Sequence, residues 1–193
     1  MKKTLSGLGI IVAFCLFFLG NTYNSLVKKQ EKVAQSFGQV QAVYQRRLDL
    51  IPNLVATVKG YASHEQNTLI AVTKARQAAS ASLHSPAINS PKQFKQFSAS
   101  QASLGNALNH LMVVVEHYPN LKASENFLTL QTQLEGTENR IEIARERFND
   151  ATQSYNTATR QFPANILATI GHFTTKPYFH ASVKSATAPT VKF

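Results

Sequence analysis

Three carboxylates recur along one predicted helix in the second half of the chain. Glu135, Glu138 and Glu142 are spaced at i, i+3 and i+7, which places them on one face of that helix. Such a face could carry out acid–base catalysis or bind a divalent cation. It could instead fix the alignment of neighbouring helices through ion pairs with Arg46 and Arg47 of the first predicted helix. We favour the structural ion pairs over catalysis.

The six histidines are the other candidates for catalysis or metal binding, and their spacing predicts neither. His64 and His110 fall within predicted helices, where a surface histidine is the usual case. A di-iron bundle needs Glu-x-x-His on two helices, and a zinc-binding helix needs His-Glu-x-x-His; the sequence contains neither motif. The Gly-x-Ser-x-Gly and phosphate-binding Gly-x-x-x-x-Gly-Lys motifs are missing as well. We therefore predict no catalytic residue, no cofactor and no metal site.

The charge pattern argues against nucleic-acid binding and for a membrane segment. The 193 residues carry a net charge of +10, but the basic residues occur in pairs such as Lys28-Lys29 rather than in long runs. Nucleic-acid-binding modules concentrate Lys and Arg residues on one face of the protein, so we predict no nucleic-acid partner. A single cysteine excludes a disulfide framework. Charged residues make up 16% of the chain, below the roughly 25% of soluble domains, as a membrane segment would cause.

An uncharged segment near the amino terminus predicts a membrane anchor. Residues 4–27 carry no charge, and residues 8–19 form an apolar centre. A bilayer needs about 20 such residues. A cleaved signal peptide is the alternative. A cut after Gly20 would need a small residue two positions earlier, and that position holds Phe18. We predict an uncleaved anchor over residues 1–22, with residues 4–20 in the lipid bilayer.

The topology of this anchor is left open. Lys2 and Lys3 flank the segment on one side, and Lys28, Lys29 and Lys32 flank it on the other. Because the numbers of basic residues on the two sides are nearly equal, the positive-inside rule does not decide the orientation. The short basic tail leans toward an amino terminus inside the cytoplasm, with the large domain on the other side.

Apolar residues at three- and four-residue steps predict an all-α domain beyond the anchor. We expect coiled-coil-like helices near residues 22–51, 52–83, 92–118 and 122–162. Short connections favour a four-helix, antiparallel up-and-down bundle. Pro52 leaves little room for a hairpin, so a three-helix bundle with one helix kinked at Pro52 is the alternative.

The chain is expected to divide into four parts. The anchor covers residues 1–22 and the helical bundle residues 23–162. Residues 163–179 are apolar and aromatic but contain Pro and Gly, so they could cap the bundle or touch the membrane surface. Residues 180–193 contain no acid and are rich in small residues, which predicts a flexible tail.

Three stretches of the chain resemble the LemA family of bacterial membrane-anchored helical proteins. Tyr23–Glu65 contains RRLDLIPNLV, Tyr118–Asn156 contains LEGTENRI, and the third stretch, FPANILATIGHF followed by KPYF, ends at Phe179. The resemblance implies a single-pass protein of the bacterial inner membrane with an antiparallel helical bundle. It implies no catalytic residue and no cofactor. A branch of LemA-like proteins is linked to magnetosome membranes, which suggests a role in membrane organisation.

These observations predict a membrane-anchored, non-enzymatic interaction or scaffold protein with protein partners; its oligomeric state is left open. One alternative is an enzyme or regulator that uses the face formed by Glu135, Glu138 and Glu142. The other is peripheral binding of anionic lipid by the basic first helices. An arginine packed against the carboxylates inside the bundle would favour the structural interpretation, whereas an open cleft with His64 or His110 nearby would favour catalysis.

Overall fold

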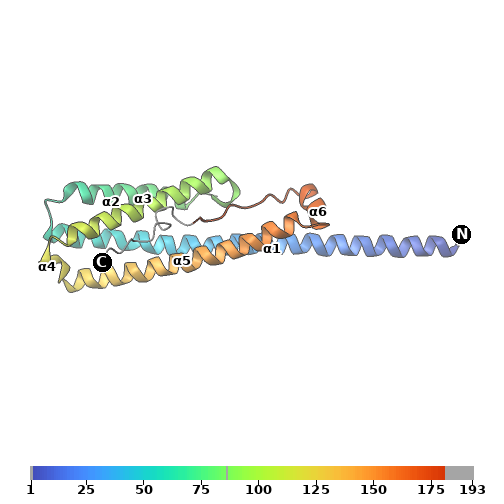
Figure 1. Cartoon of the computed structure of the whole chain (residues 1–193), viewed down its shortest axis with the longest axis horizontal. Coiled ribbons are helices and arrows are strands. Elements are labelled where there is room, and N and C mark those ends of the chain that lie inside the picture. The colour runs from blue at the N-terminus through green and yellow to red at the C-terminus, as the bar shows by residue number, and fades with distance from the viewer. Residues whose placement is uncertain (1, 86, 181–193) are drawn as a thin grey trace, which may run out of the picture.

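The protein is an elongated bundle of helices in the computed structural model (Figure 1). The structure describes the backbone of residues 2–85 and 87–180, and the side chains of residue 13, residues 17–85 and residues 87–180. In that part of the chain all regular elements are helical, which confirms the predicted all-α class. They are α1 (Lys2–Tyr61), α2 (Gln66–Leu83), the 3₁₀ helix η1 (Ala87–Asn89), α3 (Pro91–Val115), α4 (Pro119–Lys122), α5 (Glu125–Arg160) and α6 (Ala164–Ile170).

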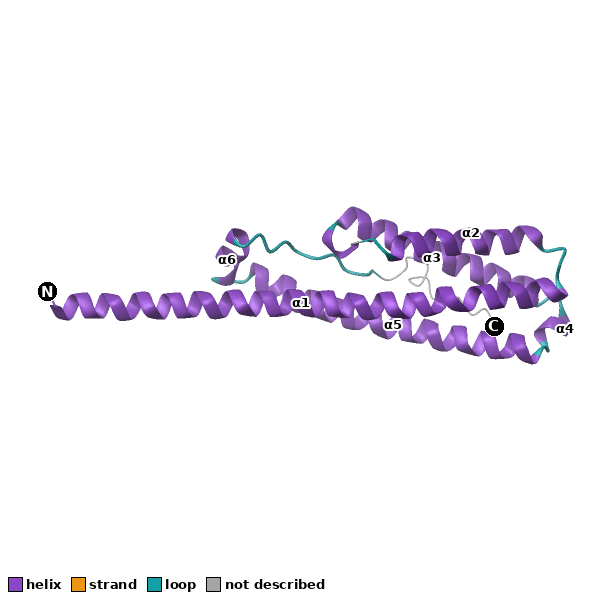
Figure 2. Ribbon diagram, turned by 180° about the vertical axis from the view of Figure 1, so that it is seen from behind, coloured by secondary structure: helices purple, strands orange, loops and turns teal. Residues whose placement is uncertain are grey.

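Four of these helices, α1, α2, α3 and α5, run up and down along the bundle, as the four-helix interpretation predicted (Figures 1 and 2). α1 packs along α5, α2 packs along α3, and α1 also contacts α2. The short α4 lies at the turn between α3 and α5. The amino-terminal part of α1 projects beyond the bundle, and α6 lies at that same end.

The predicted helix boundary at Pro52 is wrong. α1 continues through Pro52 to Tyr61, so one helix does pass through the proline, as the three-helix alternative expected. That alternative is wrong in its number of helices, because α2 is a separate helix that begins at Gln66. Proline removes the N–H that would bond the carbonyl four residues back. That carbonyl belongs to Leu48, and Nε of Arg76 in α2 donates to it at 2.9 Å. A neighbouring helix therefore supplies the donor that proline lacks, and the ring of Pro52 is exposed to solvent.

The remaining helix boundaries agree with the sequence to within a few residues. α2 ends at Leu83 as expected, and α3 begins at Pro91, one residue before the predicted start. Ser90 caps α3, because its side chain accepts a hydrogen bond from the N–H of Gln93 at 3.5 Å. α5 ends at Arg160, two residues before the predicted end at Phe162.

The core follows the predicted apolar stripes. On α5 the buried stripe includes Leu134, Thr137, Ile141, Ala144, Phe148 and Tyr155. At mid-bundle a cluster of aromatic rings joins α1, α3 and α5, formed by Phe37, Phe94, Phe97, Phe148 and Phe179. Aromatic side chains bury the most apolar area per residue, so this cluster is a main source of stability.

The expected anchor falls mostly on residues whose side chains lie outside the described set. α1 begins at Lys2 and passes through residue 22 without interruption, so no break separates anchor from bundle. Within the described residues, no helix combines the length and the apolar character that a membrane span requires. The span over residues 4–20 therefore stays a prediction. The expected tail at 180–193 lies outside the described residues apart from His180.

Candidate functional site: a groove between α3 and α5

A chain of polar contacts crosses the bundle and touches all four long helices. At its centre is Arg47 of α1, whose side chain is only 4% exposed. Its Nη1 donates to Oε1 of Glu138 on α5 at 3.0 Å, and its Nη2 donates to Oε1 of Gln101 on α3 at 2.6 Å. Nε2 of Gln101 in turn donates to the carbonyl of Ala79 on α2 at 3.2 Å. The contacts therefore fix the alignment of four helices in one layer.

Of the three carboxylates predicted to share a face of the helix, one forms an ion pair in this layer. Glu138 is the partner of Arg47, as the structural interpretation expected, and its side chain remains 51% exposed. Glu135 is exposed and accepts a hydrogen bond from Gln131, and Glu142 is exposed on the same helix. Arg46 is exposed and forms no ion pair within the described part of the chain.

The two helical histidines lie away from the carboxylates. His64 is exposed in the turn between α1 and α2, and His110 is exposed on α3. Neither lines a depression that contains Glu135, Glu138 or Glu142. Among the described residues, no three His, Cys, Asp or Glu side chains are placed to hold a metal ion. His64 and His110 therefore supply no base to these carboxylates.

The segment after α6 folds back onto the bundle as an extended strap, here defined as residues 171–180. It is bound to α5 through its main chain. Nδ2 of Asn156 donates to the carbonyl of Lys176 at 2.8 Å, and Oδ1 of Asn156 accepts from the N–H of Lys176 at 2.8 Å. Asn149 forms the same pair with Phe179, at 2.9 Å in each direction. The strap therefore runs antiparallel to α5, held by contacts that do not depend on its side chains.

Phe179 is the strap side chain that enters the aromatic core. Its ring lies 4.7 Å from that of Phe94 on α3 and 5.4 Å from that of Phe148 on α5, measured between centroids. The guanidinium of Arg145 lies 4.8 Å above the Phe179 ring and donates to the carbonyl of His180 at 3.1 Å. The strap thus fills one half of a groove between α3 and α5.

The other half of this groove continues past His180 and is open among the described residues. It has a volume of about 520 Å³. Tyr44 and Arg47 belong to its lining, together with small residues of α3, which are Ser98, Ala99, Ala102 and Gly105. In the same part of the structure, Nε of Arg47 and Oγ of Ser98 are buried without a hydrogen-bond partner. Buried donors usually have partners, so these two atoms are exceptions beside an otherwise hydrogen-bonded layer.

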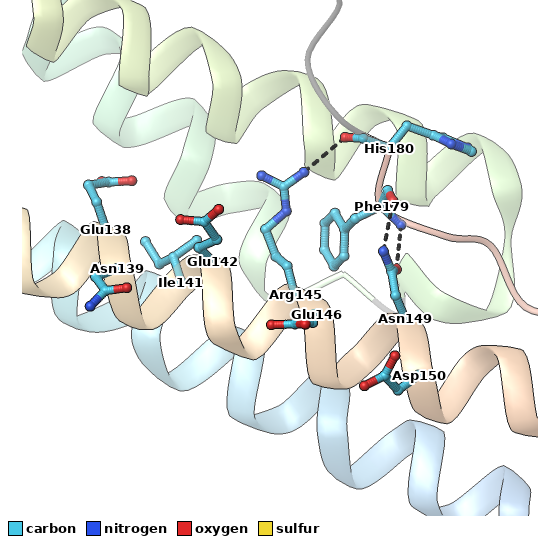
Figure 3. A pocket seen from close by; sticks show the side chains of 10 residues that line it. All are labelled: Glu138, Asn139, Ile141, Glu142, Arg145, Glu146, Asn149, Asp150, Phe179 and His180. Carbon is cyan, nitrogen blue, oxygen red and sulfur yellow. Dashed lines mark hydrogen bonds between the residues drawn. The ribbon is translucent and has the colours of Figure 1, made fainter. Parts of the chain in front are cut away.

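Beside the strap, the outer face of α5 forms a second, wider depression of about 930 Å³. Figure 3 shows its side chains, among them the carboxylates Glu138, Glu142, Glu146 and Asp150. Arg145 is the cation of this depression nearest to the strap, and the imidazole of His180 points away from Glu138 and Glu142. The depression is therefore an acidic surface next to the open end of the groove.

Burial shifts two titratable groups along the groove. It raises the pKa of Tyr44, against the opposing effect of the Arg145 and Arg47 cations. Burial also lowers the pKa of Lys176 in the strap, whose Nζ donates to Oδ1 of Asn89 at 3.1 Å. Both shifts favour the uncharged form of the side chain, as desolvation does.

Sequence reasoning missed the residues that bind the strap. Asn149 and Asn156 are seven residues apart, which places them on one face of α5. Asn156 is buried and Asn149 half-buried. Two asparagines at this spacing beside a buried stripe are the signal that could have identified them, because asparagine can satisfy both polar groups of an extended peptide unit.

The sequence comparisons agree with this architecture. The LemA family profile matches residues 36–193. Magnetosome protein MamQ of Magnetospirillum gryphiswaldense is 28% identical over 187 residues, which cover 88% of this chain and 68% of that protein. Magnetosome protein MamQ 2 of Paramagnetospirillum magneticum is 28% identical over 186 residues, with the same coverage. Protein LemA of Metamycoplasma hominis is 27% identical over 147 residues, or 75% of this chain and 63% of that protein. Because the family profile spans most of its length, this chain belongs to the LemA family.

Proposed function

We propose that this protein is a membrane-anchored, non-enzymatic scaffold that holds an extended segment of a partner protein in the groove between α3 and α5. The observation that carries the proposal is the strap, which already lies in half of that groove. Asn149 and Asn156 bind its main chain, so these two residues recognise extended polypeptide, while Phe179 adds a side-chain contact in the aromatic core.

The open half of the groove supports a partner of the same form. Its lining includes Arg145, which already donates to a main-chain carbonyl, that of His180. The open half is lined by three cations, Arg47, Lys95 and Arg145, and by one carboxylate, Glu138, while the depression alongside is acidic, so both signs of charge are available to orient a bound segment. The partner we propose is therefore an extended segment of another protein, held mainly through its main chain.

The amino-terminal helix supports attachment to a membrane. α1 contains 60 residues in one helix, which is about 90 Å at ~1.5 Å per residue. Residues 4–20 of this helix are uncharged and are proposed to span the bacterial inner membrane once. A continuous helix would place the bundle at a fixed distance from the bilayer and would hold the groove there without a flexible linker.

The scaffold explains the carboxylates better than an enzyme does. Glu138 is engaged by a buried arginine, and Glu135 and Glu142 lie exposed, with His64 and His110 elsewhere on the bundle. The names of the relatives describe no reaction. Peripheral binding of anionic lipid is less favoured, because the basic residues of the first helices are dispersed rather than clustered.

A photocrosslinking amino acid at Ala102 in the full-length chain tests the groove. Ala102 is exposed in the open half, whereas Ala71 is exposed on α2 and serves as the matched control. Irradiation of cells should join position 102 to one defined peptide of a second protein, and position 71 should not form that product. Crosslinks from position 102 that reach only this chain's own residues 181–193 would contradict the proposal and identify the tail as the occupant.

A further inference from the structure

The end of the bundle from which α1 projects carries an apolar surface that the described residues leave uncovered. In α6 and the residue pair before it, the side chains of Phe162, Ile166 and Ile170 are 82%, 53% and 71% exposed. Ile166 and Ile170 are four residues apart and share one face of α6. Residues 161–175 contain no Asp, Glu, Lys or Arg. Large side chains gathered in this way mark a contact surface rather than ordinary solvent exposure.

This surface lies where the apolar part of α1 leaves the bundle. The ring of Phe173, which follows α6, packs against that of Tyr23 on α1 with centroids 5.4 Å apart. α6 contacts α1 directly, and both views place it at the end where α1 projects (Figures 1 and 2). Phe17, Phe18 and Leu19, the described residues at the end of the apolar segment, are exposed as well. The exposed apolar residues of α6 and of α1 therefore lie near one another at this end of the bundle.

Distances along α1 place this surface at the edge of a bilayer. Tyr23 follows Leu19 by four residues, which is about 6 Å along the helix axis. Tyrosine is enriched at the boundary between hydrocarbon and headgroups. Lys28, which is exposed, follows after about one further turn, at a height where its amine would meet lipid headgroups. α6, held at the level of Tyr23 through Phe173, therefore lies at the depth that interfacial helices occupy, about 5–10 Å into the boundary.

We propose that α6 is an interfacial membrane helix, with Phe162, Ile166 and Ile170 inserted among the lipid acyl chains. This inference rests on the proposed anchor, because residues 4–20 would bring α6 to the bilayer. The occupant is lipid rather than protein, since the surface lies near the exposed apolar residues of α1 and lacks charged residues. The function that follows is a second membrane contact, which fixes the tilt and rotation of the bundle about its single anchor.

Single tryptophans test this contact, because the chain contains no tryptophan of its own. The full-length variants Ile166→Trp and Ile170→Trp would be reconstituted in phosphatidylcholine vesicles whose acyl chains carry bromine, a short-range fluorescence quencher. Val113→Trp is the matched control, because Val113 is 59% exposed near the end of α3, close to the opposite end of the bundle. Flotation of the vesicles would confirm that each variant is bound.

We expect bromolipid to quench the tryptophans at 166 and 170 by at least 2-fold relative to unbrominated vesicles, and to leave the tryptophan at 113 unchanged. Equal fluorescence with and without bromine at position 166, in a chain that floats with the vesicles, would overturn the inference and leave the anchor standing. A blue-shifted but unquenched spectrum would also overturn it, because protein rather than lipid would then cover the helix. A chain that fails to float would overturn the anchor and the inference together.

Discussion

Nε of Arg76 donates a hydrogen bond to the main-chain carbonyl of Leu48 at 2.9 Å, and this carbonyl is the one that Pro52 leaves without its helical partner. The contact joins α2 to α1 and explains why a 60-residue helix passes through a proline. The continuation of α1 past Pro52 to Tyr61 is therefore supported by a side chain from a different helix.

The substitution Arg76→Met should lower the free energy of unfolding by about 1 kcal/mol, because it removes one partly buried hydrogen bond. In a Pro52→Ala background the same change should cost almost nothing, since the restored main-chain N–H at position 52 would bond the carbonyl of Leu48 itself. Thermal unfolding followed by circular dichroism in mild detergent measures both differences. An equal cost in the two backgrounds would show that Arg76 does not replace the missing donor.

Arg47 and Arg46 are adjacent and should behave very differently when substituted. Arg47→Ala removes a buried cation and leaves Gln101 without its partner, so it should destabilise the protein by about 3 kcal/mol. Arg46→Ala should change stability by less than about 0.5 kcal/mol, because Arg46 is exposed. Glu138→Ala should cost about 1 kcal/mol, since Glu138 is half exposed and Arg47 keeps its bonds to Gln101. Chemical denaturation ranks the three variants, and similar losses for Arg46 and Arg47 would contradict this ranking.

Asn149 and Asn156, which bind the main chain of the strap, form an asparagine clamp, and its loss should free the strap without unfolding the bundle. Asn156→Ala leaves the N–H and carbonyl of Lys176 unpaired and should cost about 2 kcal/mol. Hydrogen exchange at the Lys176 amide should accelerate, whereas amides in the middle of α5 should keep their protection. Asn126→Ala, at an exposed position near the start of α5, is the control and should leave exchange in the strap unchanged. Unaltered protection at Lys176 in Asn156→Ala would rule out the clamp.

Two phenylalanines in the carboxyl-terminal part of the chain separate packing from surface contact. Phe179→Ala should cost about 3–5 kcal/mol, because Phe179 is buried among the rings of α3 and α5. Phe162→Ala should leave the stability in detergent unchanged within about 0.5 kcal/mol, since this side chain is 82% exposed. The unfolding temperatures of the two variants, compared with that of the unsubstituted protein, measure the two losses of stability. A large loss for Phe162→Ala would indicate that it packs within the protein rather than against an external surface.

Local patterns predicted most of the fold because the core repeats at helical spacing. Leu134, Ile141 and Phe148 are seven residues apart, and all three are buried as expected. The pairing of Arg47 with Glu138 could also be predicted, since opposite charges on two amphipathic helices meet when their apolar faces pack. Pro52 misled the prediction, because the donor that compensates for it comes from Arg76 on a different helix.

The strap could not be predicted from local patterns. Its residues have neither helical nor strand periodicity, and they are ordered by side chains of α5 that lie 20 to 30 residues away in sequence. The sequence identified residues 163–179 as apolar without showing that Phe179 enters the core while Phe162 stays outside it. Long-range contacts of this kind depend on the packed bundle, so they become visible only once the helices are in place.

The natural Cys15 provides the most direct test of the membrane-anchored scaffold, because it is the only cysteine and lies within the proposed span over residues 4–20. Membranes from cells that express the full-length protein would be opened by freeze–thaw and treated with a charged, membrane-impermeant maleimide. A Cys15→Ser, Ser25→Cys variant is the control, because Ser25 is exposed just outside the span. The anchor predicts that Cys15 stays unlabelled until the membranes are dissolved in SDS, while the cysteine at position 25 reacts at once. Rapid labelling of Cys15 in the opened membranes, or recovery of the chain in the soluble fraction, would contradict the account.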